Sequence, residues 1–130
     1  MATLPPLANA ELAIMDLLWH QGRLTARAIR ERLYPGAEKA QHGTVQRLLQ
    51  RLEDKGYVVR DRALPVSQFS ATITREAYAA SQLETLARRL TGGSLAPLVT
   101  HLVEQHRISR SEIERLRKLL DDAESMEEKA

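Results

Sequence analysis

The chain has 130 residues, no cysteine and a formal net charge of +2. This length fits one domain or two small lobes, and an aromatic content of only 4% leaves the core to aliphatic side chains. The lack of cysteine excludes disulfides, thiolate metal sites and cysteine nucleophiles. No apolar run approaches the roughly 20 residues of a membrane span, and the N-terminus lacks the pattern of a secretion signal. We therefore expect a cytoplasmic protein without membrane insertion.

Charge is unevenly distributed along the chain. Residues 40–75 carry six Lys and Arg against three acidic residues, and the last ten residues carry five acids and one Lys. A basic middle with an acidic tail is compatible with an anionic partner, although an ordinary solvated surface shows the same pattern.

Two short helices are predicted in the first third of the chain. Asn9 is the expected N-cap of the first, whose apolar stripe continues to about His20 and stops at Gly22. Thr25 is expected to cap the second. That helix ends in the Tyr-Pro-Gly sequence at 34–36, because the residue before a proline is disfavoured in a helix.

A third helix is predicted over about residues 42–55, with Gly56 in the left-handed position that commonly follows a helix. The apolar period then changes from helical to alternating. Residues 57–62 and 67–73 predict two strands, and the short turn at 63–66 joins them into a hairpin. An isolated hairpin is marginally stable, so we expect it to lean on the helices.

Three further helices are predicted in the second half. Thr74 is expected to cap the fourth helix, which stops at the Thr-Gly-Gly sequence 91–93. Ser94 is expected to cap the fifth, with Pro97 in its first turn, where the missing N–H is harmless. The Ser-Arg-Ser-Glu sequence at 109–112 predicts a capping box ahead of the sixth.

This order of elements predicts a mainly α fold with a small β-hairpin. We assign residues 1–74 to a winged helix-turn-helix DNA-binding domain and residues 75–130 to a C-terminal helical dimerisation lobe. The helices of the second lobe have thin, leucine-rich stripes, so we expect them to pair with a second copy; packing against the first lobe is the alternative. The expected dimer-interface residues are Leu83, Leu86, Leu90, Leu98, Val99, Leu102, Val103, Leu116 and Leu120.

The third predicted helix has an apolar and a polar face. Val45, Leu48, Leu49 and Leu52 recur at the spacing of one buried stripe, and the opposite face is rich in groups that suit DNA. Gln pairs with adenine and Arg with guanine, whereas arginines of a wing meet phosphate or the minor groove. Since any surface helix has a polar face, the helix order and the wing are needed for this interpretation. The candidate DNA-binding residues are His42, Thr44, Gln46, Arg47, Arg51, Arg60 and Arg62.

Three stretches carry a family resemblance when taken in order: "LANAELAIMDLLWHQGRLTARAIRERL", "GTVQRLLQRLEDKGYVVRDR" and "GGSLAPLVTHLVEQHRISRSEIERLRKLL". Over about residues 7–120 the chain resembles the penicillinase repressor family, which comprises winged-helix transcriptional repressors of the BlaI, MecI and CopY type. The resemblance implies a homodimeric repressor that binds double-stranded DNA at an operator dyad. By position, Thr44, Gln46, Arg47 and Arg51 match the DNA-contacting helix of the family.

The resemblance also implies that the repressor is released by loss of the dimer. In β-lactam-responsive members a sensor protease triggers cleavage within the fifth helix. The matching bond here is His101–Leu102, where those members carry Asn–Phe. A membrane sensor protease, or a protease downstream of it, is therefore an implied partner. The copper-responsive members use a C-terminal cysteine cluster, which this chain lacks.

Other interpretations rest on weaker patterns. His101, Glu104 and His106 suggest a metal site, but His106 falls off the helical face that the other two share. No nucleophile, base and orienting group are recognisable, so we expect neither catalysis nor a cofactor. Two other functions stay open: a winged-helix regulator that responds to a small molecule, and a winged-helix module that binds proteins rather than DNA.

Overall fold

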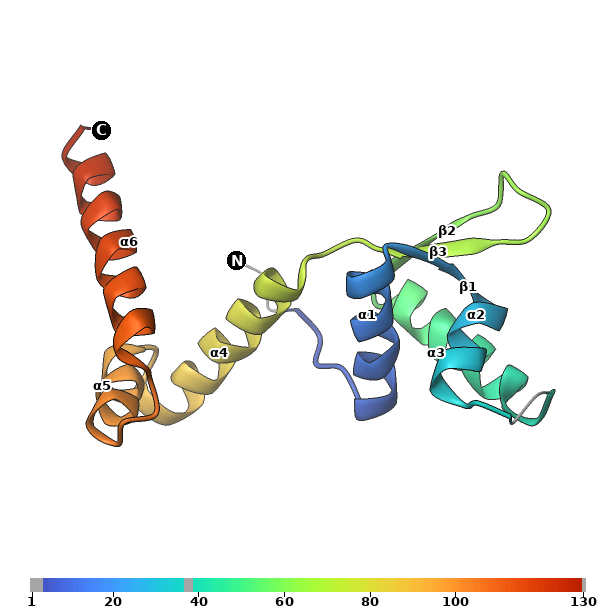
Figure 1. Ribbon diagram of the computed structural model, residues 1–130, viewed down its shortest axis with the longest axis horizontal. Coiled ribbons are helices and arrows are strands. Elements are labelled where there is room, and N and C mark those ends of the chain that lie inside the picture. Colours follow the sequence, from blue (N-terminus) through green and yellow to red (C-terminus); the bar gives the residue numbers. More distant parts are fainter. Residues whose placement is uncertain (1–3, 37–38, 130) are drawn as a thin grey trace. The chain divides into compact units, whose positions relative to one another are not determined.

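The computed structural model describes residues 4–36 and 39–129. The chain divides into two compact units, Met1–Leu83 and Glu84–Ala130. In chain order (Figure 1) the elements are α1 (Asn9–Gln21), β1 (Arg23–Thr25), α2 (Ala26–Leu33), a 3-10 turn (Lys39–Gln41), α3 (His42–Asp54), β2 (Val58–Asp61), β3 (Gln68–Ala71), α4 (Arg75–Thr91), α5 (Ala96–Glu104) and α6 (Arg110–Lys129).

The N-terminal unit combines α1, α2 and α3 with a three-stranded antiparallel sheet of order β1-β3-β2. Phe69 of the central strand pairs with Leu24 of β1 on one side and with Arg60 of β2 on the other. The loop between β2 and β3 projects from the body of the unit (Figure 1). Three helices followed by a hairpin of this kind form a winged helix-turn-helix, which confirms the fold predicted from the sequence.

The core of this unit draws on all three helices and all three strands. It is mainly aliphatic, as the composition requires, and burial of each large side chain contributes roughly 1.5–3 kcal/mol. The cluster consists of Ile14, Met15, Leu18, Leu24, Ala26, Ile29, Val45, Leu48, Leu49, Leu52, Tyr57, Val58 and Phe69.

Most of the predicted helix ends are confirmed. Thr25, Thr74 and Ser109 each accept a hydrogen bond from the backbone N–H three residues further on, at 3.1, 3.1 and 3.2 Å. Gly56 follows α3 with a φ of +84°, a left-handed conformation that glycine adopts without strain.

Two predicted caps are wrong. Ala8, rather than Asn9, occupies the N-cap position of α1, because the Glu11 carboxylate accepts the Ala8 N–H at 2.8 Å and starts the helix one residue earlier. Leu95, rather than Ser94, precedes α5 and makes no side-chain cap. The Ser94 carbonyl instead accepts a hydrogen bond from a hydroxyl at the end of α4.

Strand β1 is not among the elements predicted from the sequence. Its three residues are too few to show an alternating pattern. Leu24 is buried beside Phe69, and Thr25 leads directly into α2. Pairing with β3, rather than local sequence, makes this segment a strand.

The second unit contains the end of α4, together with α5 and α6. Among its described residues only Ala87 is buried. Gly92 and Gly93, with φ values of +66° and +104°, form the predicted break after α4. The predicted domain boundary at residue 74 lies at the start of α4, whereas by its contacts the first half of α4 groups with the winged helix. None of the described helices has the length and apolar composition needed to cross a bilayer.

Candidate nucleic-acid interface

Helix α3 is seated by four apolar side chains, Val45, Leu48, Leu49 and Leu52, which are all buried. It contacts α1, α2 and β2. The four positions repeat at the helical period, so the remaining positions point away from the core. The helix therefore presents its polar face outward, as the sequence predicts.

The predicted contact residues at the start of α3 line that outward face. His42 and Arg47 are exposed, and Thr44 and Gln46 are partly exposed. The Gln46 amide donates to His42 Nε2 at 3.3 Å across one helical turn. Arg47 has no hydrogen-bond or ion-pair partner within residues 4–36 and 39–129, so its guanidinium is available for a ligand.

Arg51 lies one turn further along α3 and leans toward α1. Its Nε is 3.7 Å from Glu11 Oε2, and its side chain is 56% exposed. Arg51 therefore makes an intramolecular ion pair while more than half of its side chain stays accessible to solvent.

Among the residues that the structure describes, Glu11 is the only charged one that is buried, and sequence analysis did not single it out. Its Oε1 accepts a hydrogen bond from Lys55 Nζ at 2.8 Å. Burial raises the pKa of this carboxyl, but hydrogen bonds from Lys55 and the Ala8 N–H, with the charges of Lys55 and Arg51, outweigh burial and lower the pKa. The carboxylate thus links α1 to the end of α3.

The two wing arginines have different surroundings. The Arg60 guanidinium lies 4.8 Å from the centre of the Phe69 ring, and its Nη2 is 3.4 Å from Glu53 Oε1, with the side chain only 20% exposed. Arg60 in this geometry packs the hairpin against α3 rather than reaching outward. Arg62 is exposed in the loop of the wing. Of the two predicted contacts, Arg62 is the one free to meet a ligand.

A cleft of about 290 Å³ joins the start of α3 to the start of α2 and to the wing. The three elements are thus neighbours on one surface. The residues that line it are Ala26, Arg27, His42, Gln46, Arg60, Pro65, Val66, Ser67 and Phe69.

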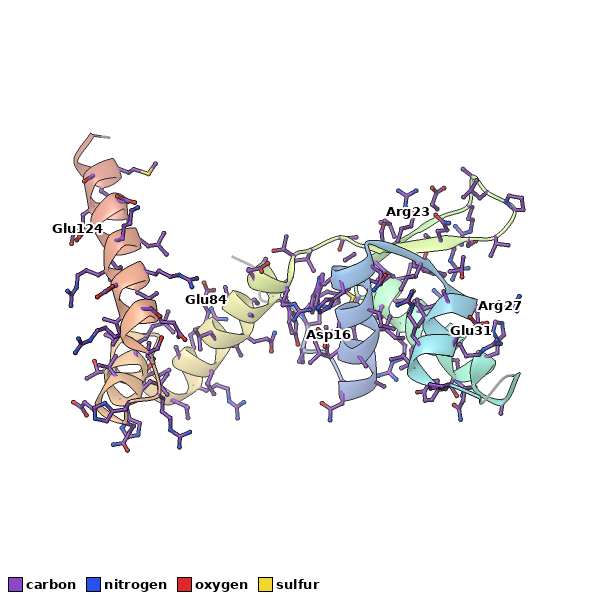
Figure 2. All side chains as sticks on the ribbon, viewed as in Figure 1. Asp16, Arg23, Arg27, Glu31, Glu84 and Glu124 are labelled. Carbon is purple, nitrogen blue, oxygen red and sulfur yellow. The ribbon has the colours of Figure 1, made fainter. Side chains whose placement is uncertain are left out.

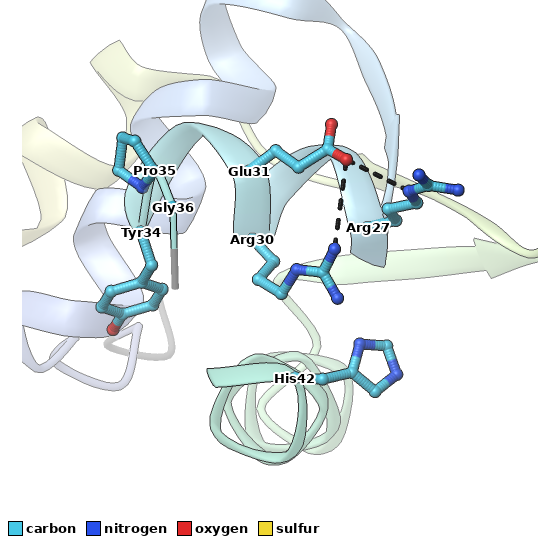
Figure 3. A pocket seen from close by; sticks show the side chains of 7 residues that line it. All are labelled: Arg27, Arg30, Glu31, Tyr34, Pro35, Gly36 and His42. Carbon is cyan, nitrogen blue, oxygen red and sulfur yellow. Dashed lines mark hydrogen bonds and ion pairs between the residues drawn. The ribbon is translucent and has the colours of Figure 1, made fainter. Parts of the chain in front are cut away.

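A second and wider depression, of about 710 Å³, adjoins this cleft at Arg27 and His42. Figure 3 shows Glu31 between two arginines of α2, with His42 opposite on α3. Glu31 Oε1 is 3.1 Å from Arg27 Nε and 4.0 Å from Arg30 Nη2. Figure 2 shows Arg27 and Glu31 together on the outside of α2. This depression extends the polar surface from α3 onto α2.

Arg27 is a functional candidate that sequence analysis missed. Its side chain is 78% exposed, and it lines both depressions. It is the second residue of a helix whose N-cap, Thr25, was recognised in the sequence. That position could have identified Arg27 from the sequence. In helix-turn-helix proteins the helix before the recognition helix, here α2, crosses the DNA backbone.

The residues predicted for a dimer interface are largely exposed on the single chain. Exposure ranges from 39% at Val99 and Val103 to 66% at Leu120, and Leu98 is partly buried. Leu83 is the last residue of the first unit, and the others belong to the second. His106 follows α5 with a φ of +56°, and no group of three or more metal-ligating side chains occurs among the described residues.

Known proteins match nearly the whole chain. The family model for the penicillinase repressor covers residues 7–122. The transcriptional regulator BlaI of Mycobacterium tuberculosis strain H37Rv is 32% identical over 127 residues, which span 96% of this chain and 90% of that protein. The penicillinase repressor of Staphylococcus aureus is 24% identical over 116 residues, spanning 89% and 91%. A crystal structure of YusO from Bacillus subtilis aligns with a TM-score of 0.48 and 20% identity, covering 92% of this chain and 75% of that one.

Replacement of the buried carboxylate, Glu11→Gln, should lower the free energy of unfolding at pH 7 by about 1–3 kcal/mol, because Lys55 loses its charged partner. The pKa of Glu11 is lower in the folded chain, so its contribution is full above the unfolded pKa of about 4.5 and is lost as the pH falls through the folded value. Urea unfolding from pH 7 to pH 3 should therefore show a weaker acid dependence in the variant. The exposed Glu76→Gln should retain the parental profile; the same acid dependence in Glu11→Gln and the parent would contradict this role.

Proposed function

The chain belongs to the penicillinase repressor family of transcriptional repressors, and we propose that it represses by binding a palindromic operator as a homodimer through its winged helix-turn-helix. The family is not enzymatic. The cytoplasm remains the expected location. One observation carries the proposal: the buried apolar face of α3 turns His42, Gln46 and Arg47 outward, and His42 and Gln46 line a cleft together with Arg27 and the wing.

In this proposal the start of α3 enters the major groove. Arg47, unpaired within the described chain, reads guanine, and Gln46 reads adenine once its amide leaves His42. Thr44 contacts a thymine methyl group or a phosphate. His42, the first residue of α3, lines the depression beside α2 and is proposed to meet the edge of the groove.

Phosphate contacts surround these base contacts and carry most of the affinity. Arg51 and Arg62 are proposed to meet phosphates. Arg27 is added to them from the structure, because it is exposed and lines the cleft together with His42 and Gln46. Arg60 is proposed to act mainly by holding the wing, since its guanidinium is already engaged by Phe69 and Glu53.

The second unit is proposed to pair with its copy. With Ala87 as the only buried residue among those described in this unit, a partner that covers the exposed leucines gains about 25 cal/mol per Å² of apolar surface. A two-fold dimer places its two α3 helices about 34 Å apart, one turn of DNA. This spacing matches the symmetry of a palindromic operator.

Release is proposed to follow from disruption of this dimer. The His101–Leu102 bond lies within α5, between residues that are proposed to form the interface. A cut there by a protease that responds to a sensor separates α6 from the rest of the lobe. Because this bond differs from the Asn–Phe pair of the β-lactam-responsive members, a protease that cuts it must have a different sequence preference.

Binding to a duplex should weaken steeply with salt, and Arg27→Ala should reduce the slope of log K against log salt by about 0.9, the value for one phosphate contact. Arg27→Lys keeps the charge and should keep the slope. Fluorescence anisotropy between 50 and 300 mM salt measures both. If the protein retained no duplex even at low salt, it would be a protein-interaction module instead of a DNA-binding protein. If Arg27→Ala left the slope unchanged, only the proposed contact of Arg27 with phosphate would be wrong.

Truncation of the base-reading arginine, Arg47→Ala, should cost roughly 1–3 kcal/mol of operator binding and relax the preference at one base pair. The loss falls on the preferred sequence, because the alternative bases never made the contact. Titration of duplexes with single substitutions measures this effect. Arg117→Ala, which removes the same charge from an exposed position on α6, is the matched control. Parental affinity and base preference in Arg47→Ala would show that the reading residue is misassigned.

A charge in the proposed interface, Leu102→Asp, should yield monomers, because an unpaired carboxylate is costly to bury between two chains. Leu120→Asp should do the same. This side chain is 66% exposed on the single chain, so the substitution should leave the winged helix folded. Analytical ultracentrifugation measures the mass. Val59→Asp, on a 53% exposed position of β2, should remain dimeric. A persistent dimer in both leucine variants would refute this interface.

A further inference from the structure

Residues 4–8, which precede α1, are bound along their whole length by side chains of other elements. Each of these five residues contributes one backbone group to such a contact. Leu4 and Leu7 also pack against the core of the N-terminal unit. Pro5 and Pro6 have no N–H and are held by their carbonyls, and their fixed φ angles lower the entropy lost on ordering. The segment is therefore built to be held in place.

Two of these contacts reach the first half of α4. The Leu4 N–H donates to Ser81 Oγ at 3.2 Å, and the Leu7 N–H donates to the Tyr78 hydroxyl at 3.0 Å. Tyr78 and Ser81 are three residues apart on the helix, or about 4.5 Å along its axis. Two attachment points fix the direction of a helix, where a single point would leave a pivot.

Two other contacts attach the same segment to the end of α3 and the start of β2. Lys55 Nζ donates to the Pro6 carbonyl at 3.3 Å, and the Tyr57 hydroxyl donates to the Pro5 carbonyl. Burial raises the pKa of Tyr57 to about 12, helped by Tyr78 and Glu11, so the phenol keeps its proton as a donor. The Tyr57 and Tyr78 rings also meet edge to face, with centroids 5.7 Å apart.

We propose that residues 4–8 form a strap that fixes the direction in which α4 leaves the winged helix, and thereby selects the half-site spacing of the operator. The inference rests on the proposed dimer, because spacing has meaning only where two winged helices bind one duplex. Within the N-terminal unit, α4 is also attached through Arg75, which pairs with Asp16 at 2.9 Å and lies 5.2 Å from the centre of the Trp19 ring. Tyr78 packs on Trp19 as well as on Tyr57. Arg75 and Tyr78 lie in or next to the first turn of the helix, whereas Ser81 lies further along it.

The length of α4 makes small changes of direction matter. From Ser81 to Thr91 the helix extends about 15 Å, so a tilt of about 10° moves its end by about 3 Å. That displacement approaches the 3.4 Å rise of one base pair. A rigid link concentrates binding on the one spacing that it fits, and a looser link spreads it over several.

The test removes the two acceptors on α4, in the double variant Tyr78→Phe, Ser81→Ala, which keeps the aromatic ring. A second variant deletes residues 2–7. Gln82→Ala, a neighbouring substitution on the same helix, is the control. The probes are duplexes with two copies of a half-site that the parent selects from a randomised pool, at spacings one base pair apart, and a duplex with a single half-site. Fluorescence anisotropy gives the affinities.

We expect the parent and Gln82→Ala to favour one spacing by about tenfold over its neighbours, and both strap variants to favour it by less than about threefold. The strap variants should bind mismatched spacings more tightly than the parent does, which mere destabilisation cannot cause. Affinity for the single half-site should be unchanged. An identical spacing profile in the parent and both strap variants would overturn the proposal.

A measurement without DNA separates the failure of the strap from the failure of the proposed function. The chain has no cysteine, so spin labels at Arg32→Cys and Arg89→Cys, diluted with unlabelled chain, report the distance between α2 and the end of α4. We expect a narrow distribution in the parent and a broader one in both strap variants. Distance distributions of equal width in the parent and the strap variants would overturn the strap, whatever the DNA measurements show. Failure of the parent to select any duplex would instead contradict operator binding.

Discussion

Burial of one face of α3 is the constraint on which the rest of the N-terminal unit depends. Turning this helix about its axis would expose Leu49 and Leu52, and the loss of burial would cost roughly 1.5–3 kcal/mol of folding free energy for each side chain. The outward face is therefore fixed by the same contacts that fold the domain. No separate interaction is needed to aim Arg47, because the helical period places it away from the core. The position of the polar surface follows from where the leucines stand.

The end of α3 is fixed by charge as well as by the apolar packing of Leu52. Lys55 follows the last turn, where a cation is favourable at the negative end of the helix dipole. Its ammonium contacts both the buried Glu11 carboxylate and the Pro6 carbonyl. One side chain thus joins α3 to α1 and to the N-terminal segment. The helix is held on one face by its leucines, and at its end by the contact of Lys55 with the buried Glu11 carboxylate.

The sequence predicts best those features that depend on local period. The α3 stripe, the hairpin and the caps at Thr25 and Thr74 follow from spacing and residue type, and the structure confirms them. Features that depend on distant pairing escape such reasoning. Strand β1 exists because β3 lies beside it, and Arg60 packs on Phe69 because the hairpin folds back onto α3. The pairing of Glu11 with Lys55 spans 44 residues, and no local pattern signals it.

The two units solve the problem of burial in different ways. The first encloses thirteen core residues, counted over the part of it that the structure describes, whereas the second buries only Ala87 among its described residues and leaves Leu90 and Leu120 about two-thirds exposed. In the proposed dimer, such a lobe gains most of its core from a partner, so its stability depends on pairing and therefore on protomer concentration. On the proposed mechanism, this coupling explains why one cut in α5 suffices for release. Removal of α6 takes away a part of the core that both protomers share. Each protomer then keeps a folded winged helix, but tight operator binding requires two winged helices joined in one dimer.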